Sequence, residues 1–171
     1  PSADGEDPLF EDVSRCAEEV VLRPGAVSNA AGPIDRFGVA AVNSAVEVDL
    51  HGNANATHIG GTHVLNGIGG SGDFVRNARL SIITLPATAA DGDISRIVPA
   101  TGHVDHTDHD VDVVVTEHGV ADLRGLSLRE RAAALVDIAD PAYSSELEEY
   151  RERVSKESGA APMGREMGVD L

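Results

Sequence analysis

The sequence predicts an α/β domain, because segments with the periodicity of strands and of helices follow one another along the chain. Apolar runs of strand length, such as residues 81–86 and 111–119, lie between segments with helical spacing. Glycine-rich turns stand near the ends of these runs. The 171 residues, of which 42% are hydrophobic and 25% charged, suffice for one domain with an aliphatic core.

The N-terminal third is predicted to contain a helix, a loop and a strand. Residues 1–7 are small and acidic and are expected to be disordered. Residues 8–22 are expected to form a helix, since apolar side chains recur at helical spacing: Leu9, Val13, Cys16 or Ala17, and Val20. Pro and Gly predict a loop at 23–33. Apolar and acidic residues alternate over 45–50, which indicates a half-buried strand ending at 51–53.

The middle of the chain is predicted to alternate between helix and strand. A glycine loop at 66–72 leads into a short helix over 73–80. Strands are expected at 81–86 and 94–99, with a turn between them, and the strongest strand pattern spans 111–119.

Two helices are predicted near the C-terminus. Ser127 and Glu130 form a capping box for a helix over 128–139. The Asp140–Pro141 pair begins a second helix that reaches about residue 157. The chain is thus expected to divide into an acidic start, one domain and a loose tail, at 1–7, 8–158 and 159–171.

The net charge of −16 argues against binding to nucleic acid or to an anionic membrane surface. Twelve of the 13 basic residues are Arg, and the only Lys is Lys156, which suggests a halophilic protein whose self-repulsion is screened by salt. An ordinary acidic domain is the alternative. The single cysteine, Cys16, excludes an internal disulfide and fits a cytoplasmic compartment. No run approaches 18 apolar residues, so no membrane span is expected.

The glycine loop formally contains the pattern GxGxxG between Gly67 and Gly72. A glycine turn before a helix exposes backbone N–H groups that suit phosphate or a developing oxyanion. Binding of NAD would also require a firm preceding strand and an acidic residue about 20 positions further on. Asp91 and Asp93 lie near that distance, but within a turn. Tight packing alone is the structural alternative.

Three further groups of residues could carry chemistry. Glu117 follows the strongest strand, where ligand sites gather in open α/β sheets, although a solvent-facing turn residue is the alternative. Glu47 and Asp49 share one strand face, which suits either acid–base work or simple solvation. The segment 103–110 is rich in potential metal ligands, which are His103, Asp105, His106, Asp108, His109 and Asp110. The spacing of these residues favours a polar network over a zinc site.

Several long motifs together resemble the C-terminal domain of the acetyl-CoA hydrolase/acetate CoA-transferase family, the family I CoA-transferases. They occur in the family's order over about residues 21–150: LRPGAVSN, RFGVAAVNSAVEVDLHGNANATH, NGIGGSGDFVRNARLSI, IVPATGHVDHTDHDVDVVVTEHGVADLRGLSLRERA and DPAYSSELEEY. The resemblance implies a three-layer α/β fold of the NagB/RpiA-like type, with a mixed sheet and flanking helices. It also implies ping-pong transfer of CoA between carboxylic acids, or hydrolysis of acyl-CoA, through a glutamyl-CoA thioester.

The same resemblance assigns roles to single residues. Glu117, in VTEHG, matches the glutamate that orients the acyl group or the attacking water, and Asn29, in VSN, matches an asparagine beside the thioester. Asn66 matches a CoA contact, while Gly69 and Gly70 match the turn whose backbone approaches CoA.

The nucleophilic glutamate of the family aligns upstream of Pro1, so a partner N-terminal domain or subunit is expected, and a homodimer by analogy. Coenzyme A is expected as substrate together with a small carboxylate, and no metal. Ala90 stands where many relatives have a lysine that can meet the CoA phosphate. An NAD-dependent oxidoreductase and a non-catalytic CoA-binding module are the alternatives, and the acyl group and the choice between transfer and hydrolysis stay open.

Overall fold

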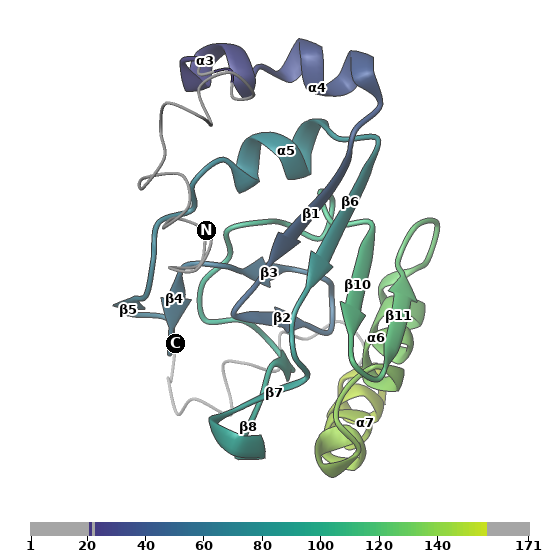
Figure 1. Ribbon diagram of the computed structural model, residues 1–171. Helices are drawn as coiled ribbons and strands as arrows, with labels where there is room; N and C mark the ends of the chain where they lie inside the picture. The colour runs from purple at the N-terminus through teal and green to yellow at the C-terminus, as the bar shows by residue number, and fades with distance from the viewer. Residues whose placement is uncertain (1–20, 22, 157–171) are drawn as a thin grey trace, which may run out of the picture.

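The computed structural model describes residue 21 and residues 23–156 (Figure 1). The acidic start, most of the helix predicted at 8–22 and the tail at 159–171 lie outside the described residues. The α/β prediction is confirmed, since strands and helices alternate along the chain. Among the described residues, no helix has the length and apolarity needed to span a bilayer.

The main sheet has four strands in the order β1–β6–β10–β11. Their bounds are β1 Ala40–Ser44, β6 Leu80–Thr84, β10 Val113–Thr116 and β11 Gly119–Asp122. The first three strands are parallel, and β11 returns antiparallel to β10. The mixed sheet expected from the sequence is therefore present. The carboxyl ends of β1, β6 and β10 consequently lie at one edge of the sheet.

A smaller sheet and two hairpins complete the strands. The smaller sheet has the order β3–β2–β9, in which β9 is parallel to β2 and β3 is antiparallel to it. The paired hairpin strands are β4 with β5 and β7 with β8. The bounds of these elements are β2 Glu47–Asp49, β3 Ala54–Asn55, β4 His58–Ile59, β5 His63–Val64, β7 Thr88–Ala89, β8 Ile94–Ser95 and β9 Ile97–Val98.

The helices lie at two places around the main sheet, as Figure 1 shows. Helices α3, α4 and α5 lie at one end, while α6 and α7 run beside β11. Their bounds are α3 Gly25–Ser28, α4 Ala31–Phe37, α5 Ser71–Asn77, α6 Leu128–Asp137 and α7 Pro141–Lys156, with a 3₁₀ turn at Ala90–Gly92. The capping box predicted for α6 is present in full.

The loop predicted at 23–33 is wrong, because this segment contains α3 and the beginning of α4. Pro33 is the third residue of α4, within the first turn, where a backbone N–H has no helical partner to lose. Gly38 ends α4 in the left-handed conformation at φ 62°. Proline and glycine thus mark the start and the end of a short helix here.

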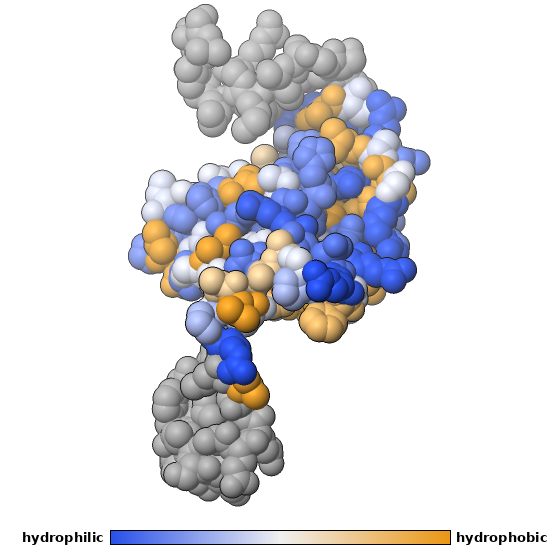
Figure 2. Space-filling view, turned by 90° about the horizontal axis from the view of Figure 1, so that it is seen from above, coloured by the Kyte–Doolittle hydropathy of each residue, from blue (hydrophilic) through white to orange (hydrophobic). Residues whose placement is uncertain are grey.

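One face of the main sheet is buried against the core, and the other carries exposed apolar side chains. Ile83, Val114 and Ala121 point into the core and are at most 2% exposed. The pairing register places Val42 and Val120 on the opposite face, where they are 63% and 66% exposed. Hydrophobic residues also interrupt the hydrophilic surface seen from above in Figure 2. The described residues therefore leave part of the sheet uncovered.

Candidate functional site

The glycine loop and Asn29 form the first group of predicted site residues that the structure brings together. A Cβ atom added at Gly70 would stand 2.5 Å from Nδ2 of Asn29, so the Asn29 amide lies directly against the Gly70 backbone. The same Nδ2 donates to Oδ2 of Asp73, in the first turn of α5, at 3.3 Å. Asn29 follows α3, so two segments 41 positions apart in the sequence meet at this point.

The backbone of this loop is available for a ligand. Gly69 has φ 57°, a left-handed conformation that favours glycine. Within the described part of the chain, the N–H groups of Gly69 and Gly70 donate no hydrogen bond. The Asn66 side chain, predicted to contact CoA, donates to the carbonyl oxygen of Ala56 at 3.1 Å, which holds the beginning of the loop. The backbone N–H groups of Gly69 and Gly70 suit an anionic or carbonyl oxygen of a ligand.

A buried histidine supports the same loop. His106 is completely buried, and its Nε2 lies 3.3 Å from Oγ of Ser71 at the start of α5. Ser71 Oγ in turn donates to the carbonyl oxygen of Ile68 at 2.7 Å. Since that hydroxyl uses its proton on Ile68, Nε2 of His106 is the donor to Ser71. Burial lowers the pKa of His106, so the ring is neutral at pH 7.

Glu117 lies in a second place, directly after β10. Its Oε2 accepts from the backbone N–H of Ala87 at 2.8 Å, and its Oε1 is 4.0 Å from Nε2 of His118. His118 Nε2 is also 3.4 Å from Oδ2 of Asp140. Hydrogen bonds from the backbone N–H groups of Glu117 itself and of Ala87 lower the pKa of the Glu117 carboxyl group. A half-exposed, ionised carboxylate therefore stands at the carboxyl edge of the parallel strands.

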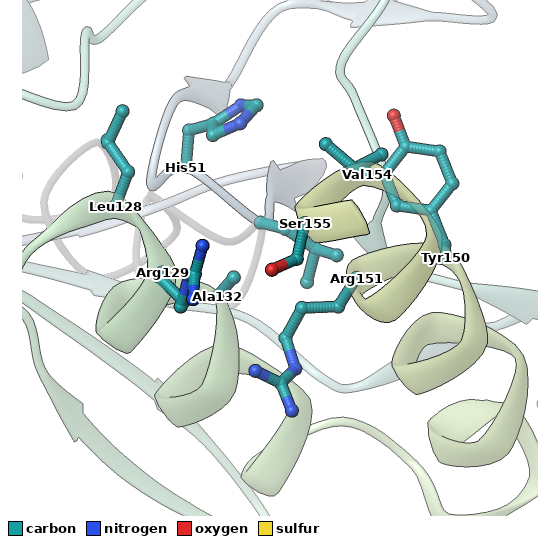
Figure 3. A pocket seen from close by; sticks show the side chains of 9 residues that line it. His51, Leu128, Arg129, Ala132, Tyr150, Arg151, Val154 and Ser155 are labelled. Carbon is teal, nitrogen blue, oxygen red and sulfur yellow. The ribbon is translucent and has the colours of Figure 1, made fainter. Parts of the chain in front are cut away.

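No hydrogen bond or ion pair among the described residues joins the Asn29–Gly70 group to Glu117. The roles that the family resemblance implies for Glu117 and Asn29 would place both groups at one thioester, and this stays a prediction. The groove in Figure 3 lies between α6 and α7 and contains none of the predicted site residues. Its lining includes His51 from the turn after β2, Arg129 from α6 and Tyr150 from α7.

The histidines of the segment 103–110 do not form one site. His106 points into the core toward Ser71, whereas the His109 side chain is 87% exposed and lies 3.8 Å from Asp108. His103 contacts Asp105, and the Asp105 carboxylate also accepts from Ala56 and Thr57. The polar network favoured by the sequence is therefore present, and it includes residues that the spacing alone did not indicate.

Glu47 and Asp49 are not a pair of solvated carboxylates. Asp49 is buried, and its Oδ1 accepts from the backbone N–H groups of the following turn, His51, Gly52 and Asn53. Glu47 instead accepts from Nδ2 of Asn55 at 2.9 Å. Asp49 therefore shapes a turn, because its side chain accepts from the backbone N–H groups that follow it.

The NAD alternative lacks its structural context. Among the residues that the structure describes, the strand before the glycine loop, β5, pairs only with β4 in a two-stranded hairpin and takes no part in the main sheet. A dinucleotide-binding turn follows a strand of the parallel sheet. Asp91 lies in the 3₁₀ turn with φ 56°, beside Ala90.

Comparison with known proteins shows the family of this chain. The sequence profile of the acetyl-CoA hydrolase/transferase C-terminal domain matches residues 5–151. The chain belongs to this family. The succinyl-CoA:acetate CoA-transferase of Clostridium kluyveri is 51% identical over 160 residues, which are 93% of this chain and 30% of that protein. The acetyl-CoA hydrolase of Candida albicans is 44% identical over 155 residues, 88% of this chain and 30% of that protein.

A solved structure of a CoA-transferase agrees with the fold. The 4-hydroxybutyrate CoA-transferase of Porphyromonas gingivalis is 38% identical and superimposes with a TM-score of 0.57 over 73% of this chain and 29% of that chain. The chain thus spans about a third of the length of the curated relatives that it matches. The resemblance stated from the sequence is confirmed, and its α/β fold agrees with that of a CoA-transferase.

Proposed function

We propose that this chain forms the part of an acyl-CoA hydrolase or CoA-transferase that binds CoA and completes the active site. The observation that carries the proposal is the Asn29 amide held against the Gly70 backbone beside unused N–H groups. Both residues lie in motifs of the acetyl-CoA hydrolase/transferase family. The single Cys and the acidic, Arg-rich composition support a cytoplasmic and halophilic protein as further parts of the proposal.

In the proposed reaction, a glutamate on polypeptide outside these 171 residues attacks the acyl-CoA carbonyl carbon. The C–S bond breaks, CoA leaves as thiolate, and an acyl-glutamyl anhydride forms. The thiolate then attacks the glutamyl carbonyl carbon, which releases the carboxylate product and leaves a glutamyl-CoA thioester. The side-chain Nδ2–H of Asn29 and the backbone N–H of Gly70 stabilise the oxyanion that develops in these steps. Glu117, ionised at pH 7, orients the acyl group or the water that ends the cycle in a hydrolase.

The exposed face of the main sheet supports a further partner in the complete enzyme. Val42 and Val120 leave apolar surface uncovered among the described residues, and Phe37, at the end of α4, is 83% exposed. Exposed apolar patches of this kind mark protein contacts. An N-terminal CoA-transferase domain or subunit and a second copy in a homodimer are the proposed partners.

Binding and turnover test the proposal separately. Calorimetric titration of the 171-residue chain is expected to detect CoA and not NAD, and the chain alone is expected not to turn over. Adding the N-terminal two thirds of a relative should restore thioester exchange between acetyl-CoA and a small carboxylate. Binding of NAD without CoA, or robust exchange by the isolated chain, would contradict the proposal. Comparing product formation with and without carboxylate separates transfer from hydrolysis.

A further inference from the structure

Two histidines and one aspartate outside the proposed active-site groups come together from segments far apart in the sequence. His58 lies on β4, whereas His103 and Asp105 lie in the connection between β9 and β10. One ring nitrogen of each His and one carboxylate oxygen all lie within 4.8 Å of one another. The two imidazole rings are in contact, with centroids 3.8 Å apart and planes tilted by 38°.

The Asp105 carboxylate is fixed in an orientation that leaves one oxygen for the histidines. Its Oδ2 accepts from the backbone N–H of Ala56 and from Oγ1 of Thr57, each at 2.7 Å. Its Oδ1 lies 3.2 Å from Nε2 of His103. The Asp105 side chain is only 8% exposed, so the cluster contains a largely buried negative charge.

The Thr57 hydroxyl connects the aspartate to the second histidine. It lies 2.6 Å from Nδ1 of His58 and donates its proton to Asp105. His58 Nδ1 must therefore donate to Thr57, and the lone pair of the ring stands on Nε2. Histidines that bind metals commonly donate their other ring N–H to an oxygen in this way.

We propose that His58, His103 and Asp105 bind a divalent transition-metal ion of the zinc class, with water completing the coordination. Zinc takes two nitrogens and a carboxylate oxygen at about 2.0–2.2 Å, which places neighbouring ligand atoms about 3.3 Å apart in a tetrahedral site. Ring nitrogens and a carboxylate oxygen that lie within 4.8 Å of one another would close by at most about 1.5 Å to reach this spacing.

The metal would hold the segment that leads into the glycine loop. Asn66 bonds to this segment twice, through its backbone N–H to the carbonyl oxygen of Thr57 at 3.4 Å and through Nδ2 to that of Ala56 at 3.1 Å. A metal bound beside Thr57 thus fastens the β4–β5 hairpin to the connection that carries His103. Its role is structural, and acyl transfer needs no step through it.

Titration of the 171-residue chain with Co²⁺ tests the site, because a tetrahedral Co²⁺ centre absorbs visible light strongly. One equivalent is expected to give such bands, and Zn²⁺ should displace it. His103→Ala and His58→Ala are each expected to weaken binding at least tenfold. His109→Ala is the matched control, since that side chain is exposed and lies outside the cluster, and it should leave binding unchanged.

Three results would overturn the proposal. They are the absence of saturable Co²⁺ binding, an equal loss in the His109→Ala control, and retention of full affinity in both cluster variants. Circular dichroism establishes whether each variant is folded, and the second variant keeps the test valid where the first does not fold. Metal binding is measured without substrate, so its outcome does not depend on whether the chain binds CoA.

Discussion

Replacing Gly70 by alanine tests whether the Asn29 amide and the loop backbone act as a unit. The backbone at Gly70, with φ −85° and ψ 0°, is open to alanine, so the substitution acts through its methyl group. That carbon would stand 2.5 Å from Nδ2 of Asn29. A carbon–nitrogen contact relaxes to about 3.5 Å, so the amide must move by about 1 Å.

This displacement should cost little stability and much activity. The Asn29–Asp73 hydrogen bond, already 3.3 Å long and exposed, would be lost, at a net cost of about 0.5 kcal/mol. A displacement of about 1 Å at a reacting centre can lower the rate by about 100-fold. Gly70→Ala is therefore expected to lower thioester exchange of the completed enzyme about 10- to 100-fold while its unfolding midpoint hardly changes.

Two further variants make the test specific. Gly32→Ala is the matched control, because Gly32 is exposed on α4, outside the glycine loop, and a Cβ there meets nothing within 4 Å, so this variant should retain activity. In an Asn29→Ala background the new methyl group has no amide to displace, so Gly70→Ala should lower the exchange rate much less there. Equal losses in both backgrounds, or full activity of Gly70→Ala, would refute the reasoning.

Four further predictions concern the Glu117 carboxylate, the cap of α6 and the net charge. The hydrogen bonds to Glu117 favour its ionised form, so a carbon-13 NMR titration of this carboxyl group should give a midpoint below pH 4.5. The stability that the carboxylate contributes is complete above pH 4.5 and is lost as the pH falls through the pKa of the folded state. Glu117→Gln should lower exchange by the completed enzyme about 100-fold, and an unchanged rate would remove Glu117 from the site. Ser127→Ala removes the capping box of α6 and should lower the free energy of unfolding by about 1 kcal/mol, whereas Ser145→Ala, on the exposed side of α7, should not. Raising KCl should stabilise a chain with a net charge of −16, and complete folding at low salt would count against a halophilic protein.

Short-range patterns carried the correct part of the fold prediction. The helix at α6 follows from Ser127 and Glu130, whose capping contacts lie within one turn, and β6 and β10 follow from runs of buried aliphatic residues. Segments with mixed signals were less predictable. Proline and glycine at 23–33 suggested a loop, although there they delimit helices. The strand expected at 94–99 is divided between β8 and β9, which pair with different partners.

The candidate sites were harder to predict than the fold, because the residues that meet in them are distant in the sequence. His58 meets His103 and Asp105 only because β4 and the later connection lie side by side, and no spacing within 103–110 indicates this. The bond between His106 and Ser71 spans 35 positions. Asp49 appeared to be half of a solvated pair, whereas the turn after β2 encloses its carboxylate.

Packing alone does not explain all the glycines of the loop at 66–72. Gly69 is required by its positive φ, and Gly70 by the Asn29 amide that occupies the place of a side chain. Neither reason applies to Gly67, which has an ordinary φ, is exposed, and has open space where a side chain would extend. Packing within the described chain therefore accounts for Gly70 and not for Gly67. A backbone kept bare toward solvent is what a ligand or a second polypeptide needs for close approach, and this favours a binding loop over a merely compact turn.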